Sequence, residues 1–513
     1  MQIRAYDWIA KHAARQPDKP ACVDARSGRA LSYAAFDQRA RRLASFLSGD
    51  LGVTQGDRVA VLATNSSDHL VVQQACIKMA AIFVPLNWRL TPCELGQQIA
   101  NAEPTVLFHA DEFRQNAEAA AGMGGVSQVL NWGEDGTGGE YERGIAAARA
   151  DFSAAEIWLD DPCMILYTSG ATGVAKGVII THAMTFFNAV NFSMIVRVGQ
   201  TSVSLCILPL FHTGGINNGA NPALHAGGTV VVCPQFEAER VLRLMSDPAL
   251  GVTHMLGVPA NYQMLSRHPD FEKTDLSRMT AAAVGGAPVP LSMHRLWRER
   301  GIAFQEGYGL TEGGPSVLIS ALDQPLDKIG STGKPVIHGE IRLVNLNGKE
   351  AAPDEIGEIW IRGPSVTPGY WNNPGATREA FVDSWFRTGD AAYRDPDGYY
   401  YIVDRWKEMY ISGGENVYPA EVENVLYELT QIAEVAVVGV ADDKWGEVGC
   451  AVIVRRDETL TAEDVMRHCE GRLARYKQPR SIVFVDSLPH NSVNKILKNE
   501  VRNQLGVGAL IGK

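Results

Sequence analysis

Short apolar, β-branched runs alternate with helical patterns over about the first four hundred residues, and this alternation constrains the fold more than any other feature. DRVAVLA and AIFVPL are typical of buried strands, and SDHLVVQQACIKMA between them is typical of a helix. The theme repeats in TVLFHA, GTVVVC, VTHMLGV, MTAAAVGG and GIAFQEGYG, with helices such as AERVLRLMS between. The pattern predicts an α/β fold with a large, multi-layer N-terminal domain and mainly parallel sheets.

The pattern changes at about Tyr399. YYYIVDRWKEMYISGGENVYPAEVENVLYEL reads as strand, polar break, strand, glycine turn and helix, and EVAVVGVADDKWGEVGCAVIV reads as two strands around a charged loop. Both features predict a small α+β C-terminal domain of common size. Two charges interrupt an apolar strand at Asp404–Arg405, so we place the boundary there and expect domains at residues 1–403 and 404–513.

Composition narrows the class of protein. A chain of 513 residues with 46% hydrophobic and 20% charged residues is ordinary for a soluble enzyme of two or three domains. The net charge of −11 argues against nucleic acid or an anionic membrane as partner. Eight cysteines without a C-x-x-C pair indicate reduced thiols in a cytoplasmic protein. Oligomeric state cannot be read from this chain, which is compatible with a homodimer.

Three segments differ in composition from the rest of the chain. The first residues, MQIRAYDWIAKHAARQPDKP, have no apolar core of a signal peptide and predict an amphipathic helix. HLVVQQACIKMAAIFVPLNW contains two Gln and one Lys and is too short to span a bilayer, so no transmembrane segment is expected. Gly133–Gly144, GEDGTGGEYERG, is rich in glycine and acid and predicts a surface loop.

Polar, glycine-rich segments follow three of the predicted strands: TSGATG follows CMILY, GGAP follows TAAAV, and EGYGLTE follows IAFQ. In open α/β sheets ligands bind beyond the carboxyl ends of the strands. Three such loops at one edge therefore predict a ligand site.

The first of these loops, TSGATGVAKGV (Thr168–Val178), has the composition of a phosphate loop. It is not a Walker loop, because Ala175 stands at the place of the second Gly and Gly177 follows Lys176 in place of Ser or Thr. Its hydroxyls, its backbone N–H groups and one Lys still suit an anion such as phosphate.

Eight motifs in order carry a family resemblance. They are YTSGATGVAKG, PLFHTGG, VGGAP, GYGLTE, STGKP, WFRTGD, DRWKEMYISGGENVYPAEVE and LPHNSVNKI. Together they resemble the acyl-adenylate-forming (AMP-binding) superfamily over nearly the whole length, and most closely its acyl-CoA synthetase branch. The resemblance implies an AMP-forming carboxylic acid:CoA ligase with ATP, Mg²⁺ and coenzyme A, in which a mobile C-terminal lid turns between the two half-reactions.

The chemistry of such a ligase explains the motifs. A carboxylate attacks the α-phosphate of ATP to give an acyl-AMP, and the thiol of CoA then displaces AMP. Because both partners in the first step are anions, the protein must supply positive charge and oriented dipoles in a dry site.

By resemblance, the opening loop holds the β- and γ-phosphates, with Lys176 as its charge and Thr172 also catalytic. Its members are Thr168, Ser169, Gly170, Thr172, Gly173 and Lys176. Outside these motifs such a segment would be an ordinary solvated turn. Ala171 and Ala175 replace the hydroxyl and the Pro that the family usually carries, which bears on rate and affinity more than on reaction type.

The resemblance assigns the metal to Glu312, with Thr168 beside it, since Mg²⁺ prefers oxygen ligands near phosphate. A lone Glu elsewhere would more often belong to a surface ion pair. Asp390 is assigned to the ribose hydroxyls, and Arg405 is its ribose or phosphate partner. The remaining nucleotide positions, among which Tyr308 stacks on adenine, are Gly286, Ala287, Pro288, Glu306, Gly307, Tyr308, Gly309 and Thr311.

Two further catalytic assignments follow from the resemblance. Lys495 corresponds to the mobile Lys that bridges the carboxylate and the α-phosphate, although Asn494 precedes it where the family has Gly. His212 corresponds to an aromatic gate between acid and nucleotide, whereas a lone His at a strand end is ordinarily structural. For coenzyme A the resemblance implies Gly413, Gly414, Trp445 and Lys477.

The acid itself is less constrained. The segments expected to line its pocket are small and mostly apolar, with Asn217 and Asn218 as polar exceptions that favour a polar tail. No Arg or Lys among them could pair with a second carboxylate, and no acid near FHTGG could pair with an ammonium. Fatty, aryl and arylpropenoic acids remain open. Two rival functions also remain: an adenylating enzyme that loads a carrier protein, and a nucleotide-binding homologue that has lost catalysis.

Overall fold

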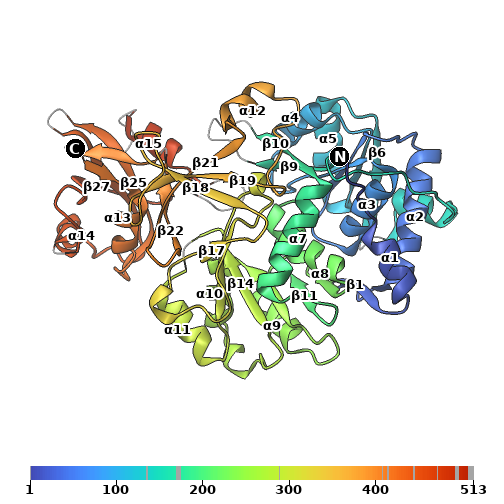
Figure 1. Cartoon of the computed structure of the whole chain (residues 1–513), viewed down its shortest axis with the longest axis horizontal. Coiled ribbons are helices and arrows are strands. Elements are labelled where there is room, and N and C mark those ends of the chain that lie inside the picture. Colours follow the sequence, from blue (N-terminus) through green and yellow to red (C-terminus); the bar gives the residue numbers. More distant parts are fainter. Residues whose placement is uncertain are drawn as a thin grey trace. The chain divides into compact units, whose positions relative to one another are not determined.

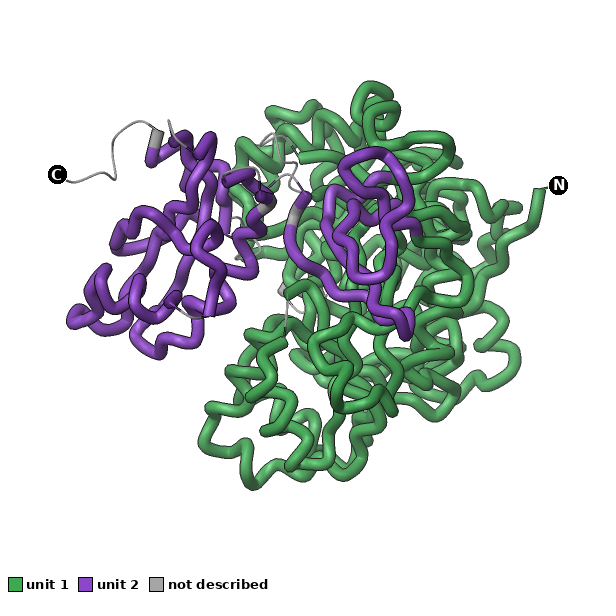
Figure 2. The backbone as a smooth tube through the Cα atoms, turned by 60° about the vertical axis from the view of Figure 1, so that its left-hand side comes forward, with its two compact units in different colours: residues 1–341, 361–386 green, residues 342–360, 387–513 purple. Residues whose placement is uncertain are grey.

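The computed structural model describes residues 2–134, 137–168, 175–287, 289–406, 408–412, 415–442, 445–470, 472–490 and 496–506. Five residues within these ranges, Glu134, Thr137, Arg405, Asn416 and Gly506, are described by their backbone alone. The chain forms two compact units, residues 1–341 with 361–386 and residues 342–360 with 387–513 (Figure 2).

A nine-stranded sheet with a parallel centre dominates the lower half of unit 1 in Figure 1. Its order is β17-β16-β15-β14-β13-β11-β12-β1-β2, and only the edge pairs β15-β16, β16-β17 and β1-β2 are antiparallel. The strands are β1 (Pro20–Asp24), β2 (Ala30–Ser32), β11 (Val203–Cys206), β12 (Thr229–Val232), β13 (His254–Gly257), β14 (Ala281–Gly285), β15 (Phe304–Tyr308), β16 (Leu318–Ile319) and β17 (Lys334–Pro335).

Helices cover both faces of this sheet. One face carries α7 (His182–Val196), the π-helical turn η2 (Gly214–Ala220) and α8 (Asn221–Ala226), and the other carries α9 (Ala238–Ser246), α10 (Pro259–Arg267) and α11 (Leu291–Glu299) (Figure 1). Successive residues of β14 divide between the faces, since Ala282 packs with Trp297 of α11 and Ala283 packs with Phe192 of α7. Burial on both faces explains why β12 and β14 are nearly continuous apolar runs.

A six-stranded sheet, β10-β9-β4-β3-β5-β6, forms the second layer of unit 1, and β9-β10 is its antiparallel pair. Its strands are β3 (Arg58–Leu62), β4 (Ile82–Pro85), β5 (Val106–His109), β6 (Gln128–Asn131), β9 (Pro162–Thr168) and β10 (Lys176–Thr181). The helices and the short strand pair of this region are α1 (Trp8–Arg15), α2 (Tyr33–Gly49), α3 (Ser67–Met79), α4 (Pro92–Ala102), α5 (Arg114–Gly124), α6 (Glu140–Ala147), β7 (Gly133–Glu134) and β8 (Thr137–Gly138).

A further five-stranded sheet has the order β18-β19-β21-β20, and its fifth strand, β22, pairs with β21. The chain passes from one unit to the other within β18, within β19 and within β21. Its elements are β18 (Glu340–Val344), β19 (Gly357–Arg362), α12 (Pro374–Ala380), β20 (Phe381–Val382), β21 (Trp385–Arg394) and β22 (Tyr400–Arg405).

Unit 2 has its own five-stranded sheet, β24-β23-β26-β25 with β27 beside β26. Its elements are β23 (Tyr410–Ser412), β24 (Glu415–Val417), α13 (Pro419–Leu426), β25 (Ile432–Asp442), β26 (Gly446–Arg455), α14 (Ala462–Cys469), β27 (Ser481–Val485) and α15 (Lys498–Gly506). Its apolar core contains Val422, Val437 and Ile453, so the unit buries a core of its own.

The predicted fold class is confirmed: parallel-centred sheets with helices on both faces, followed by a small α+β region. The domain boundary at Asp404 stays a prediction. Unit 2 also includes residues 342–360 and 387–403, which precede the predicted boundary. For the second of these ranges the reason is strand pairing: β21 pairs with β22, which contains Asp404, and Asp390 is opposite Arg405.

The prediction of a surface loop over Gly133–Gly144 is wrong in part. The segment contains the paired strands β7 and β8 and the first turns of α6, which packs on α2. The reason is Tyr141, whose ring is buried and whose hydroxyl donates to Asp68 Oδ1 at 3.0 Å.

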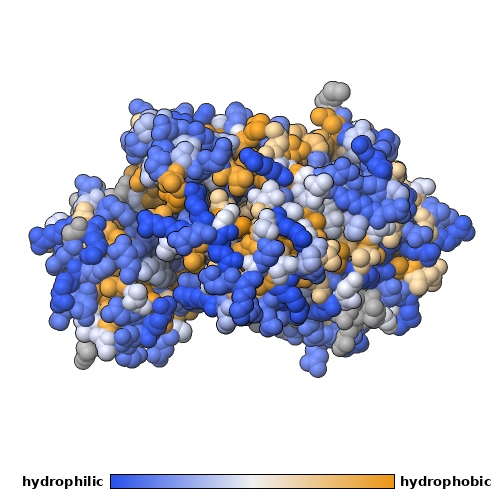
Figure 3. Space-filling view, turned by 90° about the horizontal axis from the view of Figure 1, so that it is seen from below, coloured by the Kyte–Doolittle hydropathy of each residue, from blue (hydrophilic) through white to orange (hydrophobic). Residues whose placement is uncertain are grey.

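Within the described part of the chain, every helix is too short or too polar to span a lipid bilayer. The face drawn in Figure 3 is dominated by hydrophilic residues, with hydrophobic ones showing between them.

Candidate active site

The ends of the predicted phosphate loop lie side by side at one edge of the six-stranded sheet. Thr168 ends β9 and Lys176 begins β10, and the two are directly opposite in the antiparallel ladder, with Thr168 Oγ1 donating to Lys176 O at 3.5 Å. The other loop residues of the prediction, Ser169, Gly170, Thr172 and Gly173, lie outside the described residues. The described ends thus bring a hydroxyl and an ammonium to the base of the loop.

Tyr370, which belongs to none of the eight sequence motifs, connects the end of this loop to the predicted metal ligand. Its hydroxyl donates to Glu312 Oε1 at 2.8 Å, and Lys176 Nζ lies 5.0 Å from its ring centroid. Its backbone is bridged to Val178 of β10, which fixes the ring beside the loop. Its segment, PGYWNN, carries no charge or phosphate-loop pattern, so only contacts across the fold reveal the role.

Glu312 lies in a short 3₁₀ turn, η4 (Thr311–Gly313), that follows β15. Thr367 N donates to the Glu312 carbonyl at 2.8 Å, and the Thr367 hydroxyl donates to Ile179 O at 2.7 Å, so the turn is tied to β10. Thr311 in the same turn is buried.

The metal assignment suits this donor set. In the described part of the chain, no three His, Cys, Asp or Glu side chains gather as a metal cage. Mg²⁺ usually binds through one or two carboxylates together with substrate phosphates and water, rather than in a cage of protein ligands. A single carboxylate near the end of the predicted phosphate loop therefore fits a magnesium ion carried by a nucleotide.

The carboxyl ends of β14 and β15 approach each other closely. Gly285 lies opposite Gly307, and a Cβ on Gly285 would lie 3.0 Å from the Gly307 carbonyl oxygen. Gly286 continues the chain with φ of +84°, in the left-handed region that favours glycine. A Cβ on Gly309 would lie 1.4 Å from Pro315 O, so no larger residue fits there. The two strand ends thus form a narrow backbone wall.

The other predicted nucleotide positions around this wall differ in exposure. Tyr308 is half-buried and Ala287 is exposed, whereas Pro288 lies outside the described residues.

Glu306 is the exception among the predicted nucleotide residues. Its carboxylate is buried and accepts from His294 Nε2 of α11 at 2.9 Å, and its backbone N–H donates to the Ser320 hydroxyl at 2.8 Å. The Glu306 side chain is thus occupied within the fold, so its backbone, near the carboxyl end of β15, is the part left to line a nucleotide site. Neither His294 nor Ser320 belongs to a motif that the sequence analysis identified.

His212 lies between β11 and η2, and its side chain is exposed. Its Nδ1 accepts from Gly214 N–H at 3.1 Å, which leaves the proton on Nε2. Although the side chain reaches solvent, neighbouring protein atoms desolvate part of the imidazole and lower its pKa, which favours the neutral ring. A neutral ring at the end of β11 is compatible with a gate beside an anionic substrate.

Asp390 and Arg405 are brought together within unit 2. They are partners in the antiparallel register of β21 and β22, and the Asp390 side chain is buried. The Arg405 side chain lies outside the described residues. The neighbouring Asp404 accepts from Ala420 N–H at 2.7 Å through Oδ2, so it satisfies a backbone donor at the start of α13.

The predicted coenzyme A residues are only partly described. Lys477 Nζ donates to both carboxylate oxygens of Glu421, at 2.6 and 2.8 Å. Trp445 is exposed, and the Arg480 guanidinium lies 5.8 Å from its ring centroid. The catalytic Lys495 and the turn residues Gly413 and Gly414 lie outside the described residues.

The two asparagines expected in the acid pocket have different environments. Asn217 is fully buried, donates to Thr213 Oγ1 at 3.2 Å and accepts from Asn221 Nδ2 at 3.0 Å. Asn218 Oδ1 accepts from Asn188 Nδ2 at 3.0 Å and from Ser316 Oγ at 3.1 Å. The Asn188 amide has one allowed orientation, because its Oδ1 accepts from a backbone N–H, that of Ser316. The Asn217 side chain is therefore occupied within the fold, and of the two asparagines only Asn218 lines the small cavity described next.

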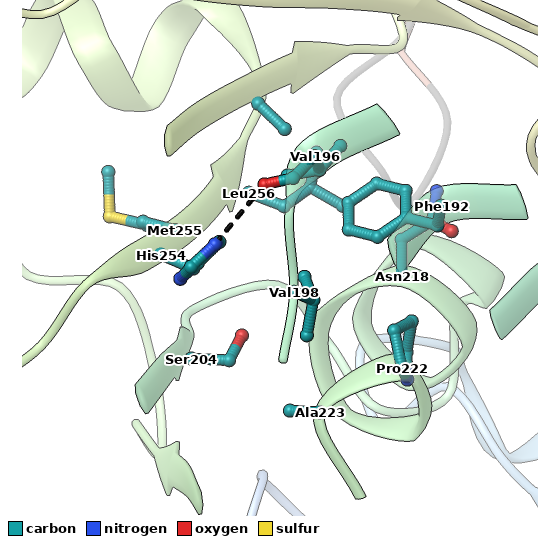
Figure 4. A pocket seen from close by; sticks show the side chains of 11 residues that line it. Phe192, Val196, Val198, Ser204, Asn218, Pro222, Ala223, His254, Met255 and Leu256 are labelled. Carbon is teal, nitrogen blue, oxygen red and sulfur yellow. Dashed lines mark hydrogen bonds between the residues drawn. The ribbon is translucent and has the colours of Figure 1, made fainter. Parts of the chain in front are cut away.

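A small cavity of about 10 Å³ lies between α7, η2 and α8 on one side and β11, β13 and β14 on the other (Figure 4). Its lining contains no Asp, Glu, Lys or Arg, and His254 is its one titratable residue. The lining residues are Phe192, Val196, Val198, Ser204, Asn218, Pro222, Ala223, His254, Met255, Leu256 and Ala283.

Comparison with protein families gives two consecutive matches. The model of the AMP-binding enzymes matches residues 9–371, and the model of the AMP-binding enzyme C-terminal domain matches residues 421–495. A feruloyl-CoA synthase of Amycolatopsis sp is 39% identical over 500 residues, covering 97% of this chain and 98% of that protein. The long-chain-fatty-acid–CoA ligase FadD13 of Mycobacterium tuberculosis is 34% identical over 507 residues, covering 97% and 98%.

A solved structure shares the fold over the whole length. The o-succinylbenzoate coenzyme A synthetase of Bacillus subtilis, in complex with ATP and a magnesium ion, superposes with a TM-score of 0.88 at 28% identity. The match covers 98% of this chain and 100% of that one. With two family models in sequence and relatives aligned end to end, this chain belongs to the family of AMP-binding enzymes.

Proposed function

We propose that the acid activated by this chain is a monocarboxylic acid with an uncharged tail, either aryl, arylpropenoic or fatty. The chain is an AMP-forming acid–thiol ligase that uses ATP, Mg²⁺ and coenzyme A, the class to which its curated relatives belong. The observation that carries the substrate proposal is the uncharged lining of the cavity between α7, α8 and the nine-stranded sheet.

In this proposal the loop between Thr168 and Lys176 neutralises the β- and γ-phosphates while the acid's carboxylate attacks the α-phosphate. Charge and oriented donors act most strongly in a site from which water is excluded. The contacts of Tyr370 support this role, because the same side chain contacts both Lys176 and Glu312 and so keeps the two near each other. Glu312 and Thr168 would hold the magnesium ion, which supplies further positive charge at the phosphates.

The remaining roles are proposals of the same kind. Asp390, with Arg405, binds the ribose, and the buried position of the Asp390 carboxyl supports a defined acceptor there. Lys495 bridges the carboxylate and the α-phosphate in the first half-reaction. His212 gates the acid from the nucleotide as a neutral ring, and unit 2 presents Gly413 and Gly414 to CoA in the second half-reaction.

The cavity chemistry restricts the acid. A second carboxylate buried there would lack a cationic partner, and a buried, unpaired charge is strongly unfavourable. The ammonium of an amino acid would equally lack an acidic partner, because the lining contains neither Asp nor Glu. Malonate-type acids and amino acids are therefore disfavoured, whereas aryl, arylpropenoic and fatty tails match the lining.

The test is a panel of acids in acid-dependent pyrophosphate exchange and hydroxamate formation. It should contain substituted cinnamic acids, benzoic and arylacetic acids, saturated acids of increasing length, malonate and several amino acids. We expect activation of one or more uncharged-tail acids at least about 100-fold over malonate, since a missing partner for a buried group costs selectivity of this order. Activation of malonate or an amino acid above all others would refute the substrate proposal.

The acceptor needs its own test, because a carrier-protein pantetheine could take the place of CoA. Thioester formation with free CoA and with a holo carrier protein should be compared at equal concentration, and CoA should be preferred. If ATP binds but no acid in the panel is activated, the chain is a homologue that has lost catalysis. A homodimer and a cytoplasmic location complete the proposal, and the eight free cysteines are compatible with a reducing compartment.

A further inference from the structure

Unit 2 contains a buried ion pair, Glu423 with Lys498, that has no part in the reaction as proposed so far. Lys498 Nζ lies 2.8 Å from Glu423 Oε1, and the two side chains are only 15% and 13% exposed. Burial raises the pKa of Glu423 by desolvation, and the Lys498 ammonium opposes that shift. Glu423 is on α13 and Lys498 begins α15, so the pair joins two helices that are distant in the sequence.

The ion pair lies at the edge of the sheet of unit 2. β25 ends the order β24-β23-β26-β25, with α13 packed on the face that buries Val437 and α15 packed on the face that buries Val438 (Figure 1). At the edge between the two faces, the Val437 N–H donates to Glu423 Oε1 at 2.6 Å. Glu423 therefore satisfies an outward N–H of the edge strand and binds Lys498 at the same point.

The chain before α15 is a segment whose two sides are joined to each other. His490 and Ile496 are partners in an isolated antiparallel bridge, and Leu497 N–H donates to Pro489 O at 2.8 Å. His490 Nε2 also lies 3.1 Å from Glu434 Oε1, and Glu434 belongs to β25. One side of the segment is thus held to β25 by His490, and the other side leads directly into the ion pair at the start of α15.

We propose that Glu423, acting through Lys498, is a positioning residue that fixes the backbone from which Lys495 reaches the α-phosphate. Lys495 lies outside the described residues, but it is bonded to Ile496, and adjacent Cα atoms across a trans peptide are about 3.8 Å apart. The inference rests on the proposed function, in which Lys495 bridges the carboxylate and the α-phosphate. It goes further by naming the pair that holds the base of this lysine.

The expected effect follows from the flexibility of a lysine side chain. Its long stem has several rotatable bonds, so its ammonium is placed only as well as its backbone is held. A shift of about 1 Å in a reacting group can lower a rate by about 100-fold. Releasing Lys498 should therefore slow adenylation, the step in which Lys495 acts, and spare the transfer of the acyl group to CoA. An ion pair that only stabilised the fold would affect both steps together.

The first test measures the two half-reactions separately in the full-length enzyme, with the best acid of the panel and its synthetic adenylate. Glu423→Gln removes the charge but keeps an acceptor for the Val437 N–H, and Lys498→Met removes the cation. In both variants kcat for acid-dependent pyrophosphate exchange should fall about 10- to 100-fold, while transfer from supplied acyl-AMP to CoA changes by less than about twofold. Lys498→Arg keeps a cation and should recover most of the adenylation rate.

Glu428→Gln is the control. Glu428 is also in unit 2 and also forms ion pairs, with His468 Nε2 at 3.2 Å and Arg472 Nε at 3.3 Å, but these partners belong to α14 and the chain just after it. Removing this carboxylate leaves the contacts of the Pro489–Lys498 segment in place. Both half-reactions should keep the rates of the unaltered enzyme.

Amide hydrogen exchange provides a readout that needs no acid. The Leu497 N–H closes the base of the segment by donating to Pro489 O, so its exchange reports whether the base is held. It should exchange at least about tenfold faster in Glu423→Gln and Lys498→Met than in Glu428→Gln. Equal exchange in all three variants would overturn the proposal.

The outcomes separate the two proposals. If no acid is activated, or if Lys495→Ala slows both half-reactions equally, the proposed role of Lys495 fails and this inference fails with it. If Lys495→Ala slows adenylation alone but Glu423→Gln and Lys498→Met adenylate as fast as Glu428→Gln, only the positioning assignment is wrong. Equal loss of both half-reactions with a lowered melting temperature would overturn it as well, because the pair would then be purely structural. If Lys498→Met is unfolded at the assay temperature, Glu423→Gln decides.

Discussion

Replacing Tyr370 with Phe removes one hydroxyl and leaves the aromatic ring in place. In the structure that hydroxyl donates to Glu312 Oε1 at 2.8 Å, and the ring lies under Lys176 with Nζ 5.0 Å from its centroid. The side chain is only 9% exposed, so Phe fills the same space. The variant therefore tests the hydrogen bond to the proposed magnesium ligand and preserves the contact with the lysine.

The magnitude follows from the charge of the acceptor. A hydrogen bond to a charged group contributes about 1.5–3 kcal/mol, and about 1.4 kcal/mol corresponds to a factor of ten. If the bond orients the Glu312 carboxylate in the transition state of adenylation, Tyr370→Phe should lower kcat for acid-dependent pyrophosphate exchange by about 10- to 100-fold. The Mg²⁺ concentration for half-maximal rate should rise as well, because the carboxylate loses its fixed orientation.

The assay is a titration of Mg²⁺ at saturating ATP and acid. Tyr167→Phe is the matched control: Tyr167 is in β9 beside the same loop, but its hydroxyl donates to Gln98 O at 2.9 Å and Asn101 Oδ1 at 2.8 Å, away from Glu312. We expect the control to retain the Mg²⁺ dependence of the unaltered enzyme. Equal rates and equal Mg²⁺ dependence in Tyr370→Phe and Tyr167→Phe would refute the reasoning, because Tyr370 would then play no part in holding the metal ligand.

Three other perturbations have defined outcomes. Gly309→Ala places a Cβ where Pro315 O lies 1.4 Å away, so adenylation and melting temperature should both fall sharply; an active, fully stable variant would show that the strand end adapts. Burial alone would raise the pKa of Asp68, but its arginine partners, among them Arg39 Nε at 3.0 Å from Oδ1, hold that pKa below its ordinary value. The ionised Asp68 carboxylate therefore stabilises the folded state at pH values above its unfolded pKa of about 3.9, and this stabilisation is lost as the pH falls toward the folded pKa. Asp68→Asn should lower the free energy of unfolding by about 3–5 kcal/mol at pH 7 and by less near pH 3. Urea unfolding at the two pH values measures the difference. Lys495→Ala should abolish adenylation yet largely spare the transfer of supplied acyl-AMP to CoA, and equal loss in both steps would contradict its bridging role.

Local patterns in the sequence determined the class of fold and predicted the place of the site. Apolar runs such as those of β3, β4 and β12 favour buried strands over buried helices, because they are short, rich in β-branched residues and bounded by turn residues. The loops after β9, β14 and β15 were recognisable because backbone that binds or closely approaches a ligand needs glycine and small polar residues. Order along the chain then placed them at the ends of strands.

The tertiary structure decided which side chains meet. Tyr370 reaches Glu312 across 58 residues of sequence, and His294 takes up the carboxylate of Glu306 from a neighbouring helix. Neither partner could be identified from its neighbours in the sequence, because a hydrogen bond depends on where two distant backbones place their side chains. The tertiary environment likewise separated two residues that look alike in the sequence. Ala282 and Ala283 are identical and adjacent, yet the period of two along a strand places Ala282 in the apolar core around Trp297 and Ala283 on the opposite face of the sheet with Phe192.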